Sequence, residues 1–261
     1  MDNIAKITFC GGAGSVTGSN FLFEADGKKI LIDCGLTQGT KLADDINWSP
    51  FTYDPSKVDF LFISHAHIDH LGRIPKLVAE GFKGHIYSTH PTKALAGPML
   101  EDTMVILSKN REFDLAKIYN EENINSALRS WQGFDYHYKV RITDNLYAIM
   151  LNAGHILGSA MIMFVYNGKK ILFTGDLGNS PSPLLPDTEV VDDIDYLIME
   201  SVYGDRNHES RNERRKFLEE AIEDNHKRKG TLIIPTFSLE RSQELLFELN
   251  ETLYLYIKLK F

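Results

Sequence analysis

The sequence predicts an α/β fold in which two mixed β-sheets pack face to face with helices outside them. Short apolar segments of β type form two blocks, one in the first third of the chain and one from 145 to 201. Helical segments follow each block, and turns containing glycine separate the strands within it. Two such blocks indicate two sheets, each with helices packed on its outer face.

The first block begins with a strand over 6–10 that leads into a glycine-rich turn. The segment 20–34 predicts a hairpin closed at Asp26-Gly27, because this dipeptide favours the tight turn that joins two strands. The next expected elements are a buried strand over 58–65, a helix over 71–82, a strand over 84–89 and helical structure over 91–130.

The second block contains a strand over 145–154 and a hairpin over 159–176 that turns at Asn167-Gly168. A further strand is expected over 194–201, after a proline-rich loop. The remaining chain predicts a helix over 209–230, a strand over 231–237 and a helix over 238–253.

Composition and charge narrow the class of protein. No apolar segment is long enough to span a bilayer, and the first residues lack the pattern of a secretory signal. Two cysteines, Cys10 and Cys34, are not a disulfide framework and fit a reducing cytoplasm. The net charge of −8 argues against a surface that binds nucleic acid throughout, although basic residues gather between Arg206 and Lys229.

The segment 64–70, SHAHIDH, has the composition of a metal site. His65 and His67 alternate along an extended chain and therefore point the same way. Asp69 and His70 follow where the chain leaves the strand. Imidazole nitrogen and carboxylate oxygen are ligands of zinc, and four of them exceed the needs of one catalytic ion with an open position. We therefore expect two metals.

Further ligands are expected at other strand ends. His155 follows an apolar strand, and Asp176 follows another, both between glycines that allow close approach of the backbone. Asp33 also ends a strand, where its carboxylate could orient a ligating imidazole through the free ring N–H.

The ordered motifs LIDCG, SHAHIDHLGRIPKL, GHILGSAM, FTGDLG and ESVYGDR resemble the β-CASP branch of the metallo-β-lactamase superfamily, from about Lys6 to Asn250. The resemblance implies an αββα sandwich and an RNA-processing nuclease. It also implies that His65, His67 and His155 hold one zinc, that Asp69 and His70 hold the second, and that Asp176 bridges them. Asp33 matches the first motif of the family, and Glu200 matches the acidic residue that opens the cap domain.

The expected reaction is hydrolysis of RNA phosphodiester bonds by a hydroxide shared between the two zinc ions. Asp69 and Asp176 would orient this hydroxide, and Glu200 would polarise a neighbouring group. The alternatives are hydrolysis of a thioester, lactone or β-lactam at the same metals, and a metal-binding fragment with little turnover. The cap-opening Glu200 favours the nuclease.

The resemblance divides the chain into a metallo-β-lactamase domain over 1–205 and the start of a cap domain over 206–261. The sequence ends before the last zinc ligand and the cap histidine of the family, so we expect a truncated cap and weaker occupancy of the second zinc site. The tail 253–261 alternates apolar and polar residues like an edge strand, which predicts pairing with another chain, such as a second copy in a homodimer.

Two other features carry no site. The glycine-rich segment 11–20 lacks both the Lys-Ser/Thr of a phosphate loop and the spacing of a dinucleotide motif, so a turn between strands is expected. The remaining histidines lack ligand-like neighbours and are assigned to surface or core positions: His85, His90, His137, His208 and His226.

Overall fold

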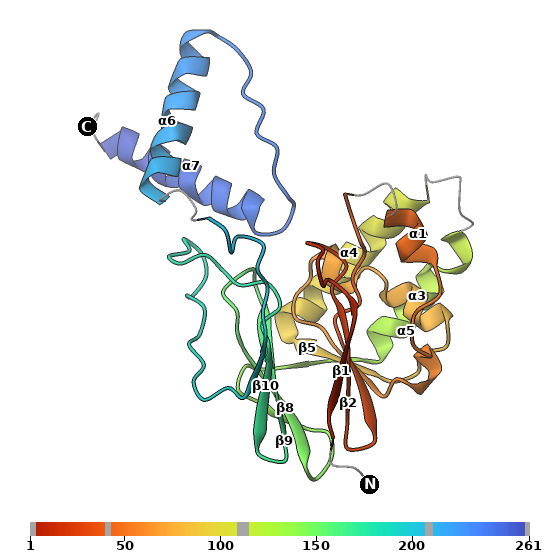
Figure 1. The fold of residues 1–261 in the computed structure, drawn as a ribbon. Helices are drawn as coiled ribbons and strands as arrows, with labels where there is room; N and C mark the ends of the chain where they lie inside the picture. The colour runs from red at the N-terminus through yellow and green to blue at the C-terminus, as the bar shows by residue number, and fades with distance from the viewer. Residues whose placement is uncertain (1–3, 40–42, 109–114, 207–210, 259–261) are drawn as a thin grey trace. The chain divides into compact units, whose positions relative to one another are not determined.

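The computed structural model describes residues 4–39, 43–108, 115–206 and 211–258. His208 and the last three tail residues lie outside the described residues. The chain divides into two compact units, Met1–Glu200 and Ser201–Phe261. Figure 1 shows two sheets and a group of helices in the first unit and two long helices in the second.

The first sheet has six strands among the described residues, in the order β1-β2-β3-β4-β5-β6. β1 to β3 are antiparallel, and β3 to β6 are parallel, so the carboxyl ends of β3, β4 and β5 meet at one edge. β2 and β3 form the hairpin predicted at Asp26-Gly27. The strands are β1 (Lys6–Gly11), β2 (Asn20–Ala25), β3 (Lys28–Ile32), β4 (Phe60–Phe62), β5 (His85–Thr89) and β6 (Trp131–Phe134).

The second sheet has the order β11-β10-β9-β8-β7 in the described chain. Its strands are antiparallel except for β11, which runs parallel to β10. β9 and β10 form the second predicted hairpin, with Asn167 and Gly168 at positive φ in its turn. The strands are β7 (Lys139–Arg141), β8 (Leu146–Asn152), β9 (Ala160–Tyr166), β10 (Lys169–Phe173) and β11 (Tyr196–Ile198).

The apolar core lies between the two sheets. Aromatic side chains join them: the ring of Phe164 lies 5.1 Å from that of Phe23 and 5.2 Å from that of Phe62. All three side chains are fully buried. Burying a side chain of this size contributes about 1.5–3 kcal/mol, so this layer fixes how the strand ends of one sheet face those of the other.

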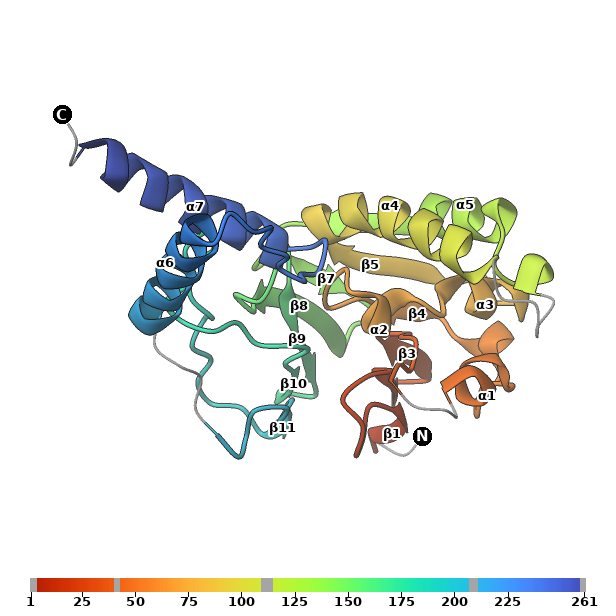
Figure 2. The same cartoon turned by 90° about the horizontal axis from the view of Figure 1, so that it is seen from above.

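Helices cover the face of the first sheet that points away from the second sheet (Figure 2). They are α1 (Ala43–Trp48), α2 (Ile68–Leu71), α3 (Ile74–Ala79), α4 (His90–Leu107) and α5 (Glu121–Arg129), with 3₁₀ turns η1 (Pro55–Lys57) and η2 (Leu115–Lys117). On the second sheet, Leu177, Val191 and Ile194 from the connection between β10 and β11 pack against the outer face. The predicted α/β class, with two sheets packed face to face, is confirmed. The helices predicted outside the second sheet are not found among the described residues of the first unit, where the connection between β10 and β11 covers that face.

Two elements of the first unit differ from the predicted ones in extent. The helix expected over 71–82 is shorter, since α3 covers only Ile74–Ala79 with Pro75 in its first turn, and Leu71 ends the separate short helix α2. The strand expected over 58–65 is hydrogen-bonded as β4 only over Phe60–Phe62. The chain after it leaves the ladder and carries the histidines.

The second unit contains α6 (Arg211–Lys227) and α7 (Arg241–Lys258). Two predictions for it were wrong. The segment 231–237 is not a strand, since Pro235 cannot donate a hydrogen bond and no strand within this unit's described residues pairs with it. The tail predicted as an edge strand from 253 onward is helical to Lys258, as a continuation of α7. The predicted homodimer therefore loses the edge strand on which it was based and stays a prediction.

The two cysteines differ in their exposure to solvent. Cys34 is fully buried, and burial raises the pKa of its thiol to about 12, whereas Cys10 is partly exposed. We expect iodoacetamide at pH 8 to modify Cys10 alone in the folded protein, because the thiolate is the nucleophile. Mass spectrometry of tryptic peptides should show Cys34 alkylated only after denaturation. Equal labelling of both thiols in the native protein would contradict this arrangement.

Candidate metal centre

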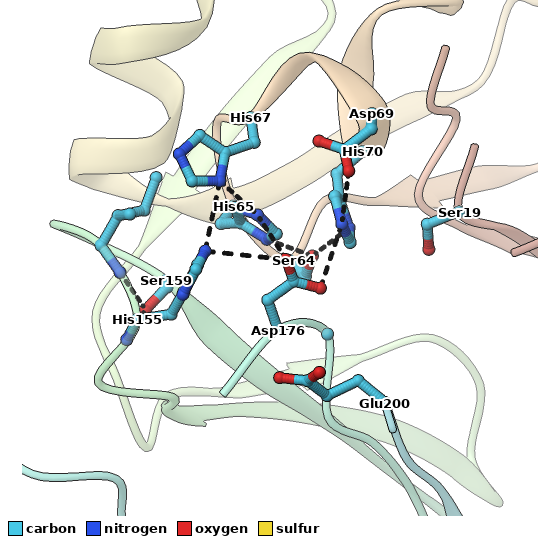
Figure 3. A network of polar contacts seen from close by, with 12 residues as sticks. Ser19, Ser64, His65, His67, Asp69, His70, His155, Ser159, Asp176 and Glu200 are labelled. Atoms are coloured by element: carbon cyan, nitrogen blue, oxygen red, sulfur yellow. Dashed lines mark hydrogen bonds and ion pairs between the residues drawn. The ribbon is translucent and has the colours of Figure 1, made fainter. Parts of the chain in front are cut away.

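The candidate ligands come together at one edge of the two sheets, where several strands end (Figure 3). The segment after β4 brings His65 and His67, and α2 brings Asp69 and His70. His155 follows β8, and Asp176 follows β10. Strands of both sheets end here, so residues more than 100 positions apart in sequence lie side by side.

Three imidazoles form the first cluster. The Nδ1 atom of His67 lies 3.1 Å from Nε2 of His65 and 3.2 Å from Nε2 of His155. Tetrahedral zinc with bonds of about 2.0–2.1 Å places neighbouring ligand atoms about 3.3 Å apart, so these separations fit one ion. Oδ2 of Asp176 lies 3.8 Å from Nε2 of His65 and 3.6 Å from Nε2 of His155. Together these four side chains form a group that could hold a metal ion.

The second cluster surrounds His70. Its Nε2 atom lies 3.2 Å from Oδ1 of Asp176 and 3.9 Å from Oδ2 of Asp69. Asp176 therefore turns one carboxylate oxygen toward each cluster. A carboxylate in this position can bind two cations at once, which suits a two-metal centre.

Asp33 lies behind the second cluster, at the end of β3. Its Oδ2 atom is 2.7 Å from Nδ1 of His70, and its backbone has a positive φ of 58°. The carboxylate also accepts hydrogen bonds from the hydroxyl of Ser19 at 3.1 Å and from the backbone N–H of Ser64 at 2.8 Å. This placement suits the role predicted for Asp33, which is to orient a ligating imidazole through its free ring N–H. Since Nδ1 of His70 faces Asp33, its Nε2 atom points at the cluster.

One close approach of the backbone brings α2 against this carboxylate. A Cβ atom at Gly35 would lie 1.5 Å from the carbonyl oxygen of Asp69, so only glycine fits there. Backbone hydrogen bonds from Cys34 N to His70 O and from Ser19 N to Asp69 O hold the same turn. The position of Asp69 and His70 is thus fixed by the backbone as well as by side chains.

The two clusters differ in their electrostatics. Burial lowers the pKa of His65 well below its ordinary value, and the neighbouring histidines add to this effect. Burial also opposes the charge of His70, but Asp33 and Asp176 outweigh it and raise its pKa well above the usual range. Neutral His65 presents a lone pair to a metal, whereas His70 must first release a proton.

The two carboxylates of the site are shifted in opposite directions. Burial raises the pKa of Asp69, and the negative charge of Asp176 adds to this shift. For Asp176 burial acts in the same sense, but the hydrogen bond and charge of His70 prevail and lower its pKa. Asp176 is therefore the carboxylate of the pair that the histidines hold ionised.

Glu200 follows β11 and lies beside the segment that carries Asp176 (Figure 3). Its Oε1 atom accepts a hydrogen bond from the backbone N–H of Leu177 at 2.8 Å, and its own N–H donates to Oγ1 of Thr174 at 3.1 Å. Thr174 and Leu177 lie on either side of Asp176 in the sequence, so these two hydrogen bonds hold the backbone around it. The arrangement lets Glu200 hold this segment in place, and the predicted polarising role remains a prediction.

Serine residues that the motif analysis did not single out support the ligands. Oγ of Ser159 accepts hydrogen bonds from the backbone N–H groups of His155 and Ile156 at 3.0 and 3.2 Å. Ser64 and Ser19 contact Asp33. The sequence signal that could have indicated these serines is their position, since Ser64 directly precedes His65 and Ser159 lies four residues after His155.

The other described histidines lie away from the two clusters. Oδ1 of Asp135 is 4.0 Å from Nε2 of His90, and Oε2 of Glu189 is 3.4 Å from Nε2 of His137, with both imidazoles mostly exposed. His85 and His226 are also exposed. The glycine-rich segment 11–20 connects β1 to β2 as a turn, as expected. No described helix has the length and apolar composition that a membrane span requires.

Comparison with known proteins gives consistent matches. The metallo-beta-lactamase superfamily domain matches residues 22–201. Ribonuclease TTHA0252 of Thermus thermophilus is 36% identical over 94% of this chain and 54% of its own length. The cleavage and polyadenylation specificity factor subunit 3 of Dictyostelium discoideum is 34% identical over 96% of this chain and 32% of its own. An RNase J-like protein of Methanocaldococcus jannaschii is 36% identical over 94% and 54%.

This chain therefore spans between about a third and a half of the length of these curated relatives. Their printed names are a ribonuclease, a cleavage and polyadenylation specificity factor subunit and an RNase J-like protein, which agrees with the β-CASP resemblance. The matched range 22–201 contains every strand end that carries a residue of the two clusters, from Asp33 after β3 to Asp176 after β10, and it also contains Glu200. The chain belongs to the metallo-β-lactamase superfamily.

Proposed function

We propose that this chain carries the metal centre of a zinc-dependent hydrolase that cleaves RNA phosphodiester bonds. The observation that carries the proposal is the placement of Asp176, whose two carboxylate oxygens face two separate ligand clusters. The printed names of the curated relatives, which include a ribonuclease and a cleavage and polyadenylation factor, favour RNA as the substrate.

In this proposal His65, His67 and His155 would hold the first zinc, Asp69 and His70 would hold the second, and Asp176 would offer one carboxylate oxygen to each. The bound ions supply a nucleophile at neutral pH and stabilise the charge that develops on the phosphoryl oxygens. Asp33 keeps Nδ1 of His70 protonated. Glu200 restrains the backbone on either side of Asp176 through Leu177 and Thr174.

The second unit is proposed as part of a β-CASP cap, over the predicted range 206–261. The ESVYGDR motif, which contains Glu200 and leads into this unit, supports the assignment. The two free cysteines support a reducing compartment such as the cytoplasm.

A metal analysis and a cleavage assay test the proposal together. We expect mass spectrometry of the purified protein to find about two zinc ions per chain, and labelled RNA to be cut in a reaction that chelator stops and zinc restores. The same preparation should leave a small thioester intact. Protein without zinc or manganese would contradict the proposal, as would zinc-loaded protein that hydrolyses only the thioester. Zinc without turnover would indicate a metal-binding fragment.

A further inference from the structure

Ser64 lies at the contact between the two ligand clusters, although it is not itself a ligand. Its hydroxyl oxygen is 2.9 Å from Oδ2 of Asp33, 3.0 Å from Nδ1 of His65 and 3.3 Å from Nδ1 of His70. His65 belongs to the first cluster and His70 to the second. The Ser64 hydroxyl therefore contacts three groups: Nδ1 of one imidazole from each cluster, which points away from the cluster, and the Asp33 carboxylate.

The direction of these hydrogen bonds follows from the acceptors. Asp33 offers only acceptor oxygens when it is ionised, so the Ser64 hydroxyl proton points to Oδ2. The Ser64 oxygen is then an acceptor for Nδ1–H of His65, whose Nε2 faces His67 and Asp176. His70 donates Nδ1–H directly to the same Oδ2 atom at 2.7 Å. Both imidazoles thus carry a proton on Nδ1 and direct Nε2 at the clusters, and His70 must release its second proton, on Nε2, to bind a metal.

We propose that Ser64 is a positioning residue that extends the influence of Asp33 from the second ligand cluster to the first. Through the chain His65–Ser64–Asp33–His70, one carboxylate sets the tautomer of a ligand in each cluster. The proposal rests on the metal-binding function proposed above and adds a coupling between the two sites. Loss of the hydroxyl should weaken the first site although Asp33 and all ligands remain.

The surroundings of Ser64 hold this hydroxyl in one place. Ser64 is 1% exposed, so bulk water does not compete for its hydrogen bonds. Its backbone N–H donates to Oδ1 of Asp33 at 2.8 Å, and its carbonyl oxygen accepts from Ala160 of the second sheet at 2.8 Å. Gly175 packs so closely that a Cβ atom there would lie 2.9 Å from the Ser64 oxygen.

Ser64→Ala and Ser88→Ala form a matched pair for the test. Ser88 is also fully buried, and its hydroxyl also makes two hydrogen bonds, to Thr89 O and from Trp131 Nε1, both at 2.8 Å. Titration against a competing chelator should show about 10–100-fold weaker binding of the first zinc by Ser64→Ala, the range typical of partners behind a ligand. Ser88→Ala should bind zinc like the wild type.

Nitrogen-15 spectra of the imidazoles give a readout that a loss of stability alone would not move. In the metal-free wild type at pH 8, we expect His65 as the Nδ1–H tautomer, and in Ser64→Ala a shift toward Nε2–H. Wild-type protein that binds zinc no more tightly than Ser64→Ala, with unchanged His65 signals, would overturn the coupling alone. Wild-type protein that binds no zinc would overturn both the coupling and the proposed function.

Discussion

Replacing His67 by alanine is expected to remove the first zinc and with it the proposed RNA cleavage, while leaving the fold intact. His67 is the central candidate ligand of its cluster, because its Nδ1 atom lies 3.1 Å from Nε2 of His65 and 3.2 Å from Nε2 of His155. Partners behind a ligand typically affect metal affinity by about 10–100-fold, so loss of a ligand itself should exceed about 100-fold.

The fold should tolerate this change because His67 contributes little to it. His67 is the N-cap residue of α2, yet its side chain makes no capping hydrogen bond, so alanine removes no support from the helix. His90→Ala is the matched control, since its imidazole is 64% exposed and lies outside both clusters. Zinc content, RNA cleavage and the melting temperature should be measured for both variants. An active His67→Ala protein, or one that unfolds, would contradict the assignment.

The sequence allowed much of the first unit to be predicted, because local patterns determine its strands. Both hairpins have a turn dipeptide with residues at positive φ, and the apolar segments around them are long. β6 and β7 were not predicted, since segments of four and three residues carry too little periodicity. In the second unit both helices were predicted and are present as α6 and α7, whereas the two predicted β-type segments did not form strands. Its β-type segments need partner strands that local sequence cannot supply.

The candidate ligands could be named from the sequence because they lie at or shortly after strand ends and have residue types that bind zinc. Their supporting contacts could not, since Ser64 acquires its role from an aspartate 31 positions earlier in the chain. Serine is common and has no spacing rule that marks it as a partner of an imidazole. The same holds for Glu200, whose hydrogen bond to the backbone of Leu177 depends on the parallel pairing of β11 with β10.

Asp33→Ala is expected to destabilise the whole first unit as well as the second zinc site. The side chain is 1% exposed, and alanine would leave four donor groups of three residues without their acceptor: Ser19 Oγ, the Ser64 N–H and hydroxyl, and Nδ1 of His70. Breaking a buried charged pair costs about 3–5 kcal/mol. For a protein of this size, that corresponds to a melting temperature lower by roughly 6–20 °C.

Asp59→Ala provides the comparison for Asp33→Ala. Asp59 also accepts two hydrogen bonds, from Lys28 Nζ and the Lys29 N–H, both at 2.9 Å, but it is partly exposed and distant from the ligands. Its loss should cost only about 1 kcal/mol, because solvent replaces these partners. Thermal unfolding with chelator separates the cost to the fold from the cost to zinc binding. Equal melting temperatures for the two variants would refute the structural role of Asp33.

Added zinc then distinguishes the two roles of this carboxylate. A ligand that binds only the folded state stabilises it in proportion to the logarithm of its concentration over Kd, so wild type and Asp59→Ala should gain the same increase in melting temperature. Asp33→Ala should gain less, because His70 loses the acceptor that directs its Nε2 toward Asp69 and Asp176.

Asp33→Asn should recover part of the stability through the Ser64 N–H, but its amide cannot accept from both Ser64 and His70. A smaller zinc-induced increase in the Asp33→Asn protein than in the wild type would therefore show that the second acceptor oxygen of the ionised Asp33, beyond the shape of its side chain, organises the metal centre.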